Sequence, residues 1–287
     1  MHILKGYTKQ EISWMMYDWA NSAHSVIIVT LLPIFFDTVA GYTADSVSSM
    51  STWGYATSIA MLIVALAAPF LGVFGDIRGM RKKLFSFFML LGVAACAGMA
   101  FTPGMDFTSG PVAAGKVASL ILVLYIVSVI GFDASAIYYD AFLTDVTIED
   151  RMDKVSTMGY GLGYIGGSTI PLLIFLIMNL VGVPMLTCLA FVFGLTAVWW
   201  LAFSLPLLKN CEQTSGKPYE KGDVARSIKG VGTTIKEIIA NKPMLIYILS
   251  YFFYIDGVHT VISMATTYGT NLGLDSTGMM LALLLVQ

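Results

Sequence analysis

The stretch GVFGDIRGMRKKL, residues 72–84, is a short polar segment between two long apolar runs. Five of its residues stand at fixed spacing: Gly72, Asp76, Gly79, Arg81 and Lys82. Glycines permit a tight turn, and an acid beside a basic cluster can form ion pairs between neighbouring helices. We expect such pairs to hold one conformation of the protein and to break in another. A plain basic linker is the alternative interpretation.

The whole chain has the composition of a membrane protein. Of its 287 residues, 57% are hydrophobic and 12% are charged, and the mean hydropathy is +0.78. Soluble domains are about half apolar and about a quarter charged. The sequence therefore predicts lipid as the main solvent of the chain. A net charge of −2 and the lack of a basic patch with interleaved aromatics predict no nucleic-acid partner. Three cysteines form neither a disulfide framework nor a zinc spacing, so no metal and no cofactor is expected.

Seven stretches are apolar enough to cross a bilayer, which takes about 20 residues per helix. They are residues 13–37, 52–75, 84–102, 117–142, 157–181, 184–208 and 243–267. An eighth apolar stretch begins near Thr277 and continues to Gln287. Half a span would leave unsatisfied backbone groups in lipid. We therefore expect the chain to lack its last spans and to be the N-terminal part of a longer protein.

Basic residues fall in alternate linkers and predict the orientation. The N-terminus and the linkers after the second, fourth and sixth spans together hold 15 of the 16 Lys and Arg residues, and Lys116 falls on the other side. Cytoplasmic segments carry the excess of positive charge. The pattern predicts a multi-pass protein of the plasma or inner membrane with a cytoplasmic N-terminus, or of the vacuolar membrane in a eukaryote.

The longest polar stretch, residues 209–242, separates two parts of the chain. Five apolar residues recur there at helical spacing: Val224, Ile228, Val231, Ile235 and Ile239. This spacing predicts an amphipathic helix on the cytoplasmic membrane face. The linker would divide an N-terminal six-helix half, residues 1–208, from the start of a second half, residues 243–287. Such a layout is typical of transporters built from two six-helix halves.

Several motifs resemble a known family. The segment 72–84 matches the G-x-x-x-D-x-x-G-x-[RK]-[RK] signature of the major facilitator superfamily, although the basic residue usual after the aspartate is displaced to Arg78. Three further strings resemble the vacuole-effluxer-like branch of that superfamily: YDWANSA at 17–23, RMDKVSTMGYGLGYIGG at 151–167 and YFFYIDGVHTVISMA at 251–265. The resemblance implies an all-α, twelve-helix transporter fold. Eukaryotic members of the branch are associated with amino-acid efflux from the vacuole.

Acidic residues within the apolar spans are the candidate functional groups. They are Asp18, Asp133, Asp140 and Asp256, and no Lys or Arg lies within a span to neutralise them. A charge at the bilayer centre costs about 2.5–3.5 kcal/mol, so such residues nearly always face the bundle interior or a wet cavity. The family resemblance implies that spans 1, 4 and 7, which carry these acids, line the central cavity. For Asp140, near the end of its span, an interfacial position is favoured.

Spans 1 and 7 also echo one another, as a parallel repeat predicts. HSVI at 24–27 and HTVI at 259–262 each follow a Tyr and an Asp. We expect substrate or proton binding by the following residues: Asp18, Asn21, His24, Asp133, Asp256 and His259. A carboxylate in a partly desolvated site, or a histidine, can exchange a proton near neutral pH. Structural hydrogen bonds between helices are the alternative for each of these residues.

A glycine repeat marks the fifth span. Gly159, Gly163 and Gly167 recur every four residues and share one helix face, where another backbone can approach closely. The repeat predicts tight helix packing, with a role in gating as the alternative. Tyr164 occupies the position where the superfamily's antiporter motif has proline, so antiport is not inferred.

The favoured function is a secondary active permease, with no enzymatic activity. It would move a small polar solute such as an amino acid by alternating access, as a proton symporter and as a monomer in the bilayer. A divalent-metal carrier is the alternative, because Asp18, Asp256 and the two histidines are suitable ligands. An intramembrane aspartyl protease is a remote alternative, since YD at 17–18 is half of that family's signature and the G-x-G-D half is absent.

Overall fold

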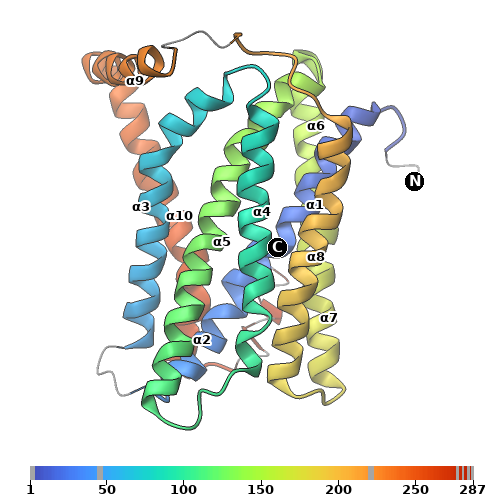
Figure 1. The fold of residues 1–287 in the computed structure, drawn as a ribbon, viewed down its shortest axis with the longest axis vertical. Coiled ribbons are helices and arrows are strands. Elements are labelled where there is room, and N and C mark those ends of the chain that lie inside the picture. Colours follow the sequence, from blue (N-terminus) through green and yellow to red (C-terminus); the bar gives the residue numbers. More distant parts are fainter. Residues whose placement is uncertain are drawn as a thin grey trace.

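Described residues of the chain fold into long, roughly aligned helices (Figure 1). The structure is a computed structural model, and it describes residues 4–43, 48–218, 223–275, 278, 279, 281, 282 and 285. Its helices are α1 (Lys9–Thr30), α2 (Leu32–Ala40), α3 (Ser49–Gly75), α4 (Arg81–Met99), η1 (Thr102–Gly104), α5 (Pro111–Val146), α6 (Glu149–Leu162), η2 (Gly163–Ser168), α7 (Thr169–Leu180), α8 (Met185–Asn210), α9 (Asp223–Ala240) and α10 (Lys242–Asn271). The predicted all-α fold is confirmed.

Seven helical segments among the described residues are long and apolar enough to span a membrane. They are Lys9–Ala40, Ser49–Gly75, Arg81–Gly104, Pro111–Val146, Glu149–Leu180, Met185–Asn210 and Lys242–Asn271. Each contains most of one predicted span, and the fourth and fifth extend beyond the predicted bounds because polar helical turns continue their apolar runs. The predicted eighth span, from Thr277, falls largely outside the described residues.

Local sequence determines where the first span begins and where it breaks. At its start, Thr8 and Glu11 form a capping box: Glu11 N–H donates to Thr8 Oγ1 at 3.1 Å and Thr8 N–H donates to Glu11 Oε2 at 2.7 Å. The span breaks at Leu31, between α1 and α2, because Pro33 has no backbone N–H for the helical ladder.

The two ends of the bundle differ in what they carry. In Figure 1 the upper end holds α9, the N-terminus and the α3–α4 and α5–α6 connections, and we call it the α9 end. The described basic residues of the alternate linkers lie at this end. The lower end holds the α2–α3, α4–α5 and α7–α8 connections. Helix α9 lies within the predicted amphipathic stretch, where Ile235 and Ile239 are exposed, whereas the side chains of Val224 and Ile228 lie outside the described part.

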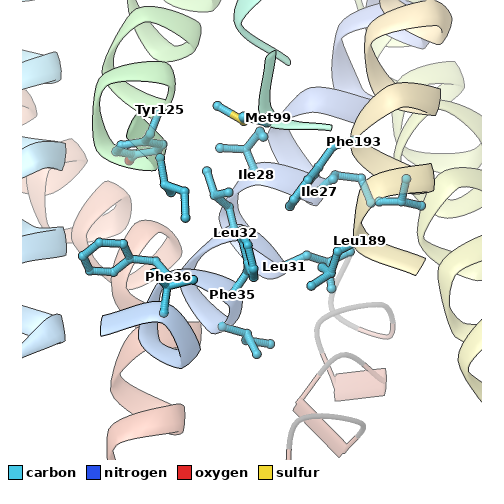
Figure 2. Packing of buried hydrophobic residues seen from close by; sticks show 14 of the residues in the cluster. Ile27, Ile28, Leu31, Leu32, Phe35, Phe36, Met99, Tyr125, Leu189 and Phe193 are labelled. Carbon is cyan, nitrogen blue, oxygen red and sulfur yellow. The ribbon is translucent and has the colours of Figure 1, made fainter. Parts of the chain in front are cut away.

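Helix packing divides the core into two clusters. Figure 2 shows the lower one, in which Leu31, Leu32 and Phe35 of the broken first span meet Leu189 and Phe193 of α8. The upper cluster surrounds Trp14, Tyr17, Phe85, Tyr138 and Trp200.

Glycines let α4 and α5 approach each other very closely. A Cβ built on Gly131 would lie 2.5 Å from the backbone nitrogen of Gly92. A side chain at either position would push the two helices apart. This close crossing sets the distance between α4 and α5, and α1 packs on α5.

Candidate functional site

One face of α1 carries four polar side chains in the middle of the first span. They are Asp18, Asn21, Ser22 and Ser25, at helical spacing. Asn21 is 8% exposed, and Ser25 Oγ donates back to the Ser22 carbonyl at 3.0 Å. In hydrocarbon such a face has to lie against protein or a wet cavity.

The glycine face of α6 and η2 lies against this part of α1. A Cβ on Gly159 would lie 2.4 Å from Asp18 Oδ2, and a Cβ on Gly163 would lie 2.6 Å from Ser22 Oγ. A Cβ on Gly167 would lie 2.5 Å from the backbone carbonyl of Trp19. Because none of these glycines has a side chain, the fifth span packs directly on the polar face of the first.

A π-helical turn interrupts the fifth span at the same level. Residues 163–168 form this turn, η2, and π-helical turns occur frequently at functional sites. Ser168 and Thr169 stabilise it by donating to the Tyr164 carbonyl at 3.1 and 2.8 Å. Two residues of this turn, Tyr164 and Ser168, line a cavity.

Helix α5 supplies the third wall through Tyr139 and Asp140. Trp14 fixes Tyr139 by stacking on its ring at a centroid distance of 4.3 Å and by donating from Nε1 to its carbonyl at 2.9 Å. Tyr139 is 4% exposed, and its hydroxyl has no hydrogen-bond partner among the described residues. The same holds for the buried Oδ2 of Asp18. The Asp18 carboxylate and the Tyr139 hydroxyl lie close to each other beside one cavity, and no hydrogen bond of normal geometry joins them.

This cavity has a volume of about 260 Å³ and is formed by α1, α5, α6 and η2. Its lining residues are Asp18, Asn21, Ser22, Ser25, Phe132, Ala136, Tyr139, Asp140, Tyr160, Tyr164 and Ser168. We call it the Asp18 cavity. It is smaller than the roughly 300–1,000 Å³ of drug-sized ligand sites, so its size suits a small solute.

The structure brings together only part of the predicted binding set. Asp18 and Asn21 line the Asp18 cavity. Asp140, for which an interfacial position was favoured, lines it as well, and its side chain is exposed. Tyr139, Tyr160 and Tyr164 are lining residues that sequence reasoning missed, although the spacing of four between Tyr160 and Tyr164 placed these two on one helix face.

His24 and Asp133 are not among the lining residues of the Asp18 cavity. His24 is 3% exposed and lies in the core between Phe132 and Trp200, at centroid distances of 4.8 and 5.0 Å. It is offset around α1 from Asp18 and Ser22, which explains why it points to α5 and α8. Asp133 is partly buried beside Phe132, one residue around the helix from the lining face.

Asp256 and His259 lie on α10 and are not among the described residues that line the Asp18 cavity. Both side chains are exposed, and α10 packs against α2, α3 and the end of α1. The expected site shared by spans 1 and 7 is therefore not formed by the described residues. Those residues also contain no group of three His, Cys, Asp or Glu side chains that would hold a metal ion.

At the α9 end, Arg81 makes a different main contact from the predicted one. Its guanidinium pairs with Asp145 of α5, and it donates to the Ala141 carbonyl at 2.9 Å. Asp76 lies 3.8 Å away from Arg81, and its side chain is 83% exposed. The predicted Asp76–Arg81 pair is therefore the weaker of the two, because Asp145 lies on the helix against which Arg81 packs.

Residues 211–217, which follow α8, close over the 72–84 segment, and we call them the clasp. Gln213 Oε1 accepts from the N–H groups of Gly79 and Arg81 at 2.8 and 3.2 Å, while its Nε2 donates to the Gly75 carbonyl at 3.0 Å. Gly79 adopts φ +81°, a left-handed conformation that favours glycine.

The clasp also holds the partner of Arg81. Asp145 accepts from the N–H and hydroxyl of Thr214 at 3.0 and 2.9 Å and from the Ser215 N–H at 2.8 Å. Nearby, Lys82 Nζ donates to the Cys211 carbonyl at 3.1 Å. Arg81, Asp145 and the clasp therefore form one network that joins α4, α5 and the end of α8.

A second ion pair at the same end joins α1 to α6. Arg151 donates to both carboxylate oxygens of Glu11, at 2.9 and 2.8 Å, and Thr147 donates to Glu11 at 2.7 Å. Glu11 is 1% exposed, and this bidentate geometry is the strong form of a carboxylate–guanidinium contact. It connects the start of the first span to the start of the fifth.

These features define an α-helical membrane protein with a polar cavity between its first, fourth and fifth spans. The sequence profile described as "Vacuole effluxer Atg22 like" matches residues 7–148 and 145–287. The chain belongs to this family, which confirms the resemblance inferred from its motifs.

Individual relatives agree with this assignment. The chain is 39% identical to the "Uncharacterized MFS-type transporter YxiO" of Bacillus subtilis over 293 residues, covering 99% of this chain and 66% of that protein. It is 26% identical to autophagy-related protein 22-1 of Penicillium rubens over 136 residues, covering 44% of this chain and 23% of that protein. The protein of the same name from Sclerotinia sclerotiorum is 26% identical over 131 residues, covering 40% and 22%. The chain thus spans less than two thirds of each relative.

Proposed function

We propose that this protein is a secondary active transporter that moves a small polar solute by alternating access. The observation that carries the proposal is the Asp18 cavity, where the neighbouring polar groups of Asp18 and Tyr139 lie inside a membrane-spanning bundle without a hydrogen bond of normal geometry. Burying such atoms without partners is costly, so a site of this kind favours a ligand that satisfies them. Similarity of the chain to a protein named as an MFS-type transporter supports the same function.

Proton coupling is the second part of the proposal. Asp18 is the proton-binding group, because it is the carboxylate packed between α1 and the glycine face of the fifth span. The titratable groups that face it across the cavity are Tyr139 and Asp140 of α5 and Tyr160 and Tyr164 of the fifth span. An amino acid suits the cavity by size, and its ammonium group suits the carboxylates. A contribution of Asp256 and His259, on α10, to substrate or proton binding stays a prediction.

The network at the α9 end acts as the gate in this proposal. Arg81, Asp145 and the clasp hold α4, α5 and the end of α8 together, and Glu11 with Arg151 holds the first and fifth spans. Both sets of contacts lie on one side of the Asp18 cavity, so they stabilise a state closed on that side. With the N-terminus in the cytoplasm, that state is closed to the cytoplasm.

Transport by reconstituted protein tests the proposal. Proteoliposomes carrying the natural full-length protein would be given a mixture of amino acids and other small metabolites under an imposed pH gradient, with internal solutes measured by mass spectrometry. We expect gradient-dependent accumulation of at least one solute and a loss of about tenfold or more in Asp18→Asn. Asp106→Asn is the matched control, because Asp106 is an exposed loop residue far from the cavity. Undiminished, pH-driven transport by Asp18→Asn would remove Asp18 from the mechanism.

A further inference from the structure

The charges that line the Asp18 cavity are of one sign. Its described lining includes two carboxylates, Asp18 and Asp140, and no Lys, Arg or His. An anionic solute would meet uncompensated repulsion there, whereas a cation would be attracted by both groups. The lining therefore selects for positive charge.

Aromatic rings make up much of the remaining surface. Phe132, Tyr139, Tyr160 and Tyr164 all line the cavity. Tyr160 and Tyr164 have ring centroids 6.3 Å apart and planes inclined by 29°, so they form one aromatic wall on the fifth span. Aromatic faces attract cations, and combinations of such faces are the usual receptor for alkylated ammonium groups.

Two of the four cavity rings, Phe132 and Tyr139, are held in place by buried aromatic rings that stack on them. Phe132 stacks on the buried ring of His24 at 4.8 Å, and Tyr139 stacks on Trp14 at 4.3 Å. A rigid wall loses little conformational entropy when a ligand binds. The packing of His24, which keeps it out of the cavity, thus contributes to the shape of the site.

One pair of neighbouring polar groups at this site, Asp18 and Tyr139, lies buried without a hydrogen bond of normal geometry. Tyr139 is more than nine-tenths buried, and its hydroxyl lines the cavity without a hydrogen-bond partner among the described residues. Asp18 Oδ2 is also buried and unpartnered there. An ammonium group would bring positive charge to the Asp18 carboxylate. Its N–H groups, or its polarised methyl groups if it is alkylated, would contact the oxygen atoms of both Asp18 and Tyr139.

We propose that the Asp18 cavity binds a small organic cation, through its ammonium group, between the Asp18 and Asp140 carboxylates and the Tyr160–Tyr164 wall. The role of this cation as cargo rests on the proposed transport function, but its binding does not. The cation is a free solute in this proposal, since the cavity has a volume of only about 260 Å³, and a lipid headgroup is the alternative source that the experiment tests.

Binding of radiolabelled choline to the purified full-length protein in a maltoside detergent tests the proposal. Choline is compared with its uncharged isostere 3,3-dimethylbutan-1-ol, which has the same shape and lacks the charge. We expect saturable choline binding that the isostere does not displace at tenfold excess. Short-chain phosphatidylcholine is the third competitor, and we expect it to leave choline binding unchanged.

Variants assign the binding to the cavity. Asp18→Asn is expected to weaken choline binding about tenfold or more, and Tyr164→Leu, which removes one aromatic face, about two- to tenfold. Asp140→Asn, at an exposed position where folding is not at risk, is expected to weaken it severalfold. Tyr247→Leu is the matched control, because Tyr247 is an exposed tyrosine of α10 outside the cavity. Melting curves of each variant verify folding.

The outcomes separate this proposal from the transport function. Absence of saturable choline binding, equal binding of the isostere, or wild-type binding by both Asp18→Asn and Asp140→Asn would overturn the cation site. Displacement by phosphatidylcholine would overturn the free-solute assignment. If proteoliposomes accumulate an uncharged or anionic solute in an Asp18-dependent way, transport stands and the cation site fails. If choline binds and no solute is transported, the site stands and the transport function fails.

Discussion

At the scale of single residues, the glycine contact in the site that is least able to adjust is the one between Gly167 and the backbone of the first span. A Cβ at this position would meet the backbone carbonyl of Trp19 at 2.5 Å, and a backbone atom cannot rotate away. Gly167→Ala is therefore expected to destabilise the protein by about 1–3 kcal/mol through overpacking. Thermal unfolding in detergent, followed by intrinsic fluorescence, measures the change.

Gly161 provides the control for that substitution. It lies in the same helical stretch, and a Cβ there would have no neighbour within 4 Å. Gly161→Ala should leave the melting temperature unchanged or raise it slightly, since alanine favours helix. An equal loss in both variants would show that helix–helix packing is not the cause.

Cys211 carries a second prediction at this scale. Burial raises the pKa of its thiol from the ordinary value of 9 to about 12. Between these values the unfolded chain ionises the thiol and the folded chain does not, so ionisation favours unfolding as the pH rises above 9. Cys211→Ala is expected to melt lower than the wild type at pH 7 and to close part of that gap by pH 11. A constant gap across this range would contradict the raised pKa.

The sequence predicted some of these residues and missed others for identifiable reasons. Asp18 was predicted because an acidic residue within an apolar span can be recognised from the sequence, whichever direction its side chain takes. Tyr160 and Tyr164 were missed because tyrosine is common in membrane helices, and only the packing of the glycine face of the fifth span on α1 brings them to Asp18. Asp145 was missed because an acid at a span end needs no special partner.

At the scale of elements, the clasp is a short segment that fixes the connection between the second and third spans. Gln213 provides three hydrogen bonds to backbone groups of Gly75, Gly79 and Arg81. We expect Gln213→Ala to destabilise the protein by about 1–3 kcal/mol, since backbone donors lose their acceptor. Hydrogen exchange at residues 75–81 should increase in the same variant.

Glu212→Ala is the matched control for the clasp. Glu212 is the exposed neighbour of Gln213 and makes no described hydrogen bond or ion pair. Its substitution should change neither the melting temperature nor exchange at residues 75–81. Equal behaviour of the two variants would show that the clasp contacts do not stabilise this connection.

Element boundaries followed from hydropathy, but contacts between elements did not. All seven spans were predicted, because each is a long apolar run between polar linkers. The clasp reads in sequence as an ordinary polar linker, so nothing in its composition indicated that it folds back on the 72–84 segment. The pairing of Arg81 with Asp145 depends on the same fold.

At the scale of the whole molecule, the distribution of charge predicts the orientation. The α9 end carries the described basic linkers, and the opposite end carries the α4–α5 connection and Lys116 in the first turns of α5. We expect Glu212→Cys to face the cytoplasm and Met105→Cys to face the other side, because cytoplasmic segments retain positive charge. Both positions are exposed.

Labelling with a membrane-impermeant maleimide in intact cells measures this orientation. The three native cysteines are buried and give a low background. Met105→Cys should react in intact cells, and Glu212→Cys should react only after permeabilisation. The opposite pattern would invert the topology and, with it, the side on which the proposed gate closes.

The eleven described residues that line the Asp18 cavity lie between positions 18 and 168, in three spans that are early in the chain. One contiguous exchange between this protein and a relative would therefore transplant this described lining together with its supporting glycines. Hybrids joined in the α7–α8 connection would reveal whether ligand preference is inherited with the first five spans.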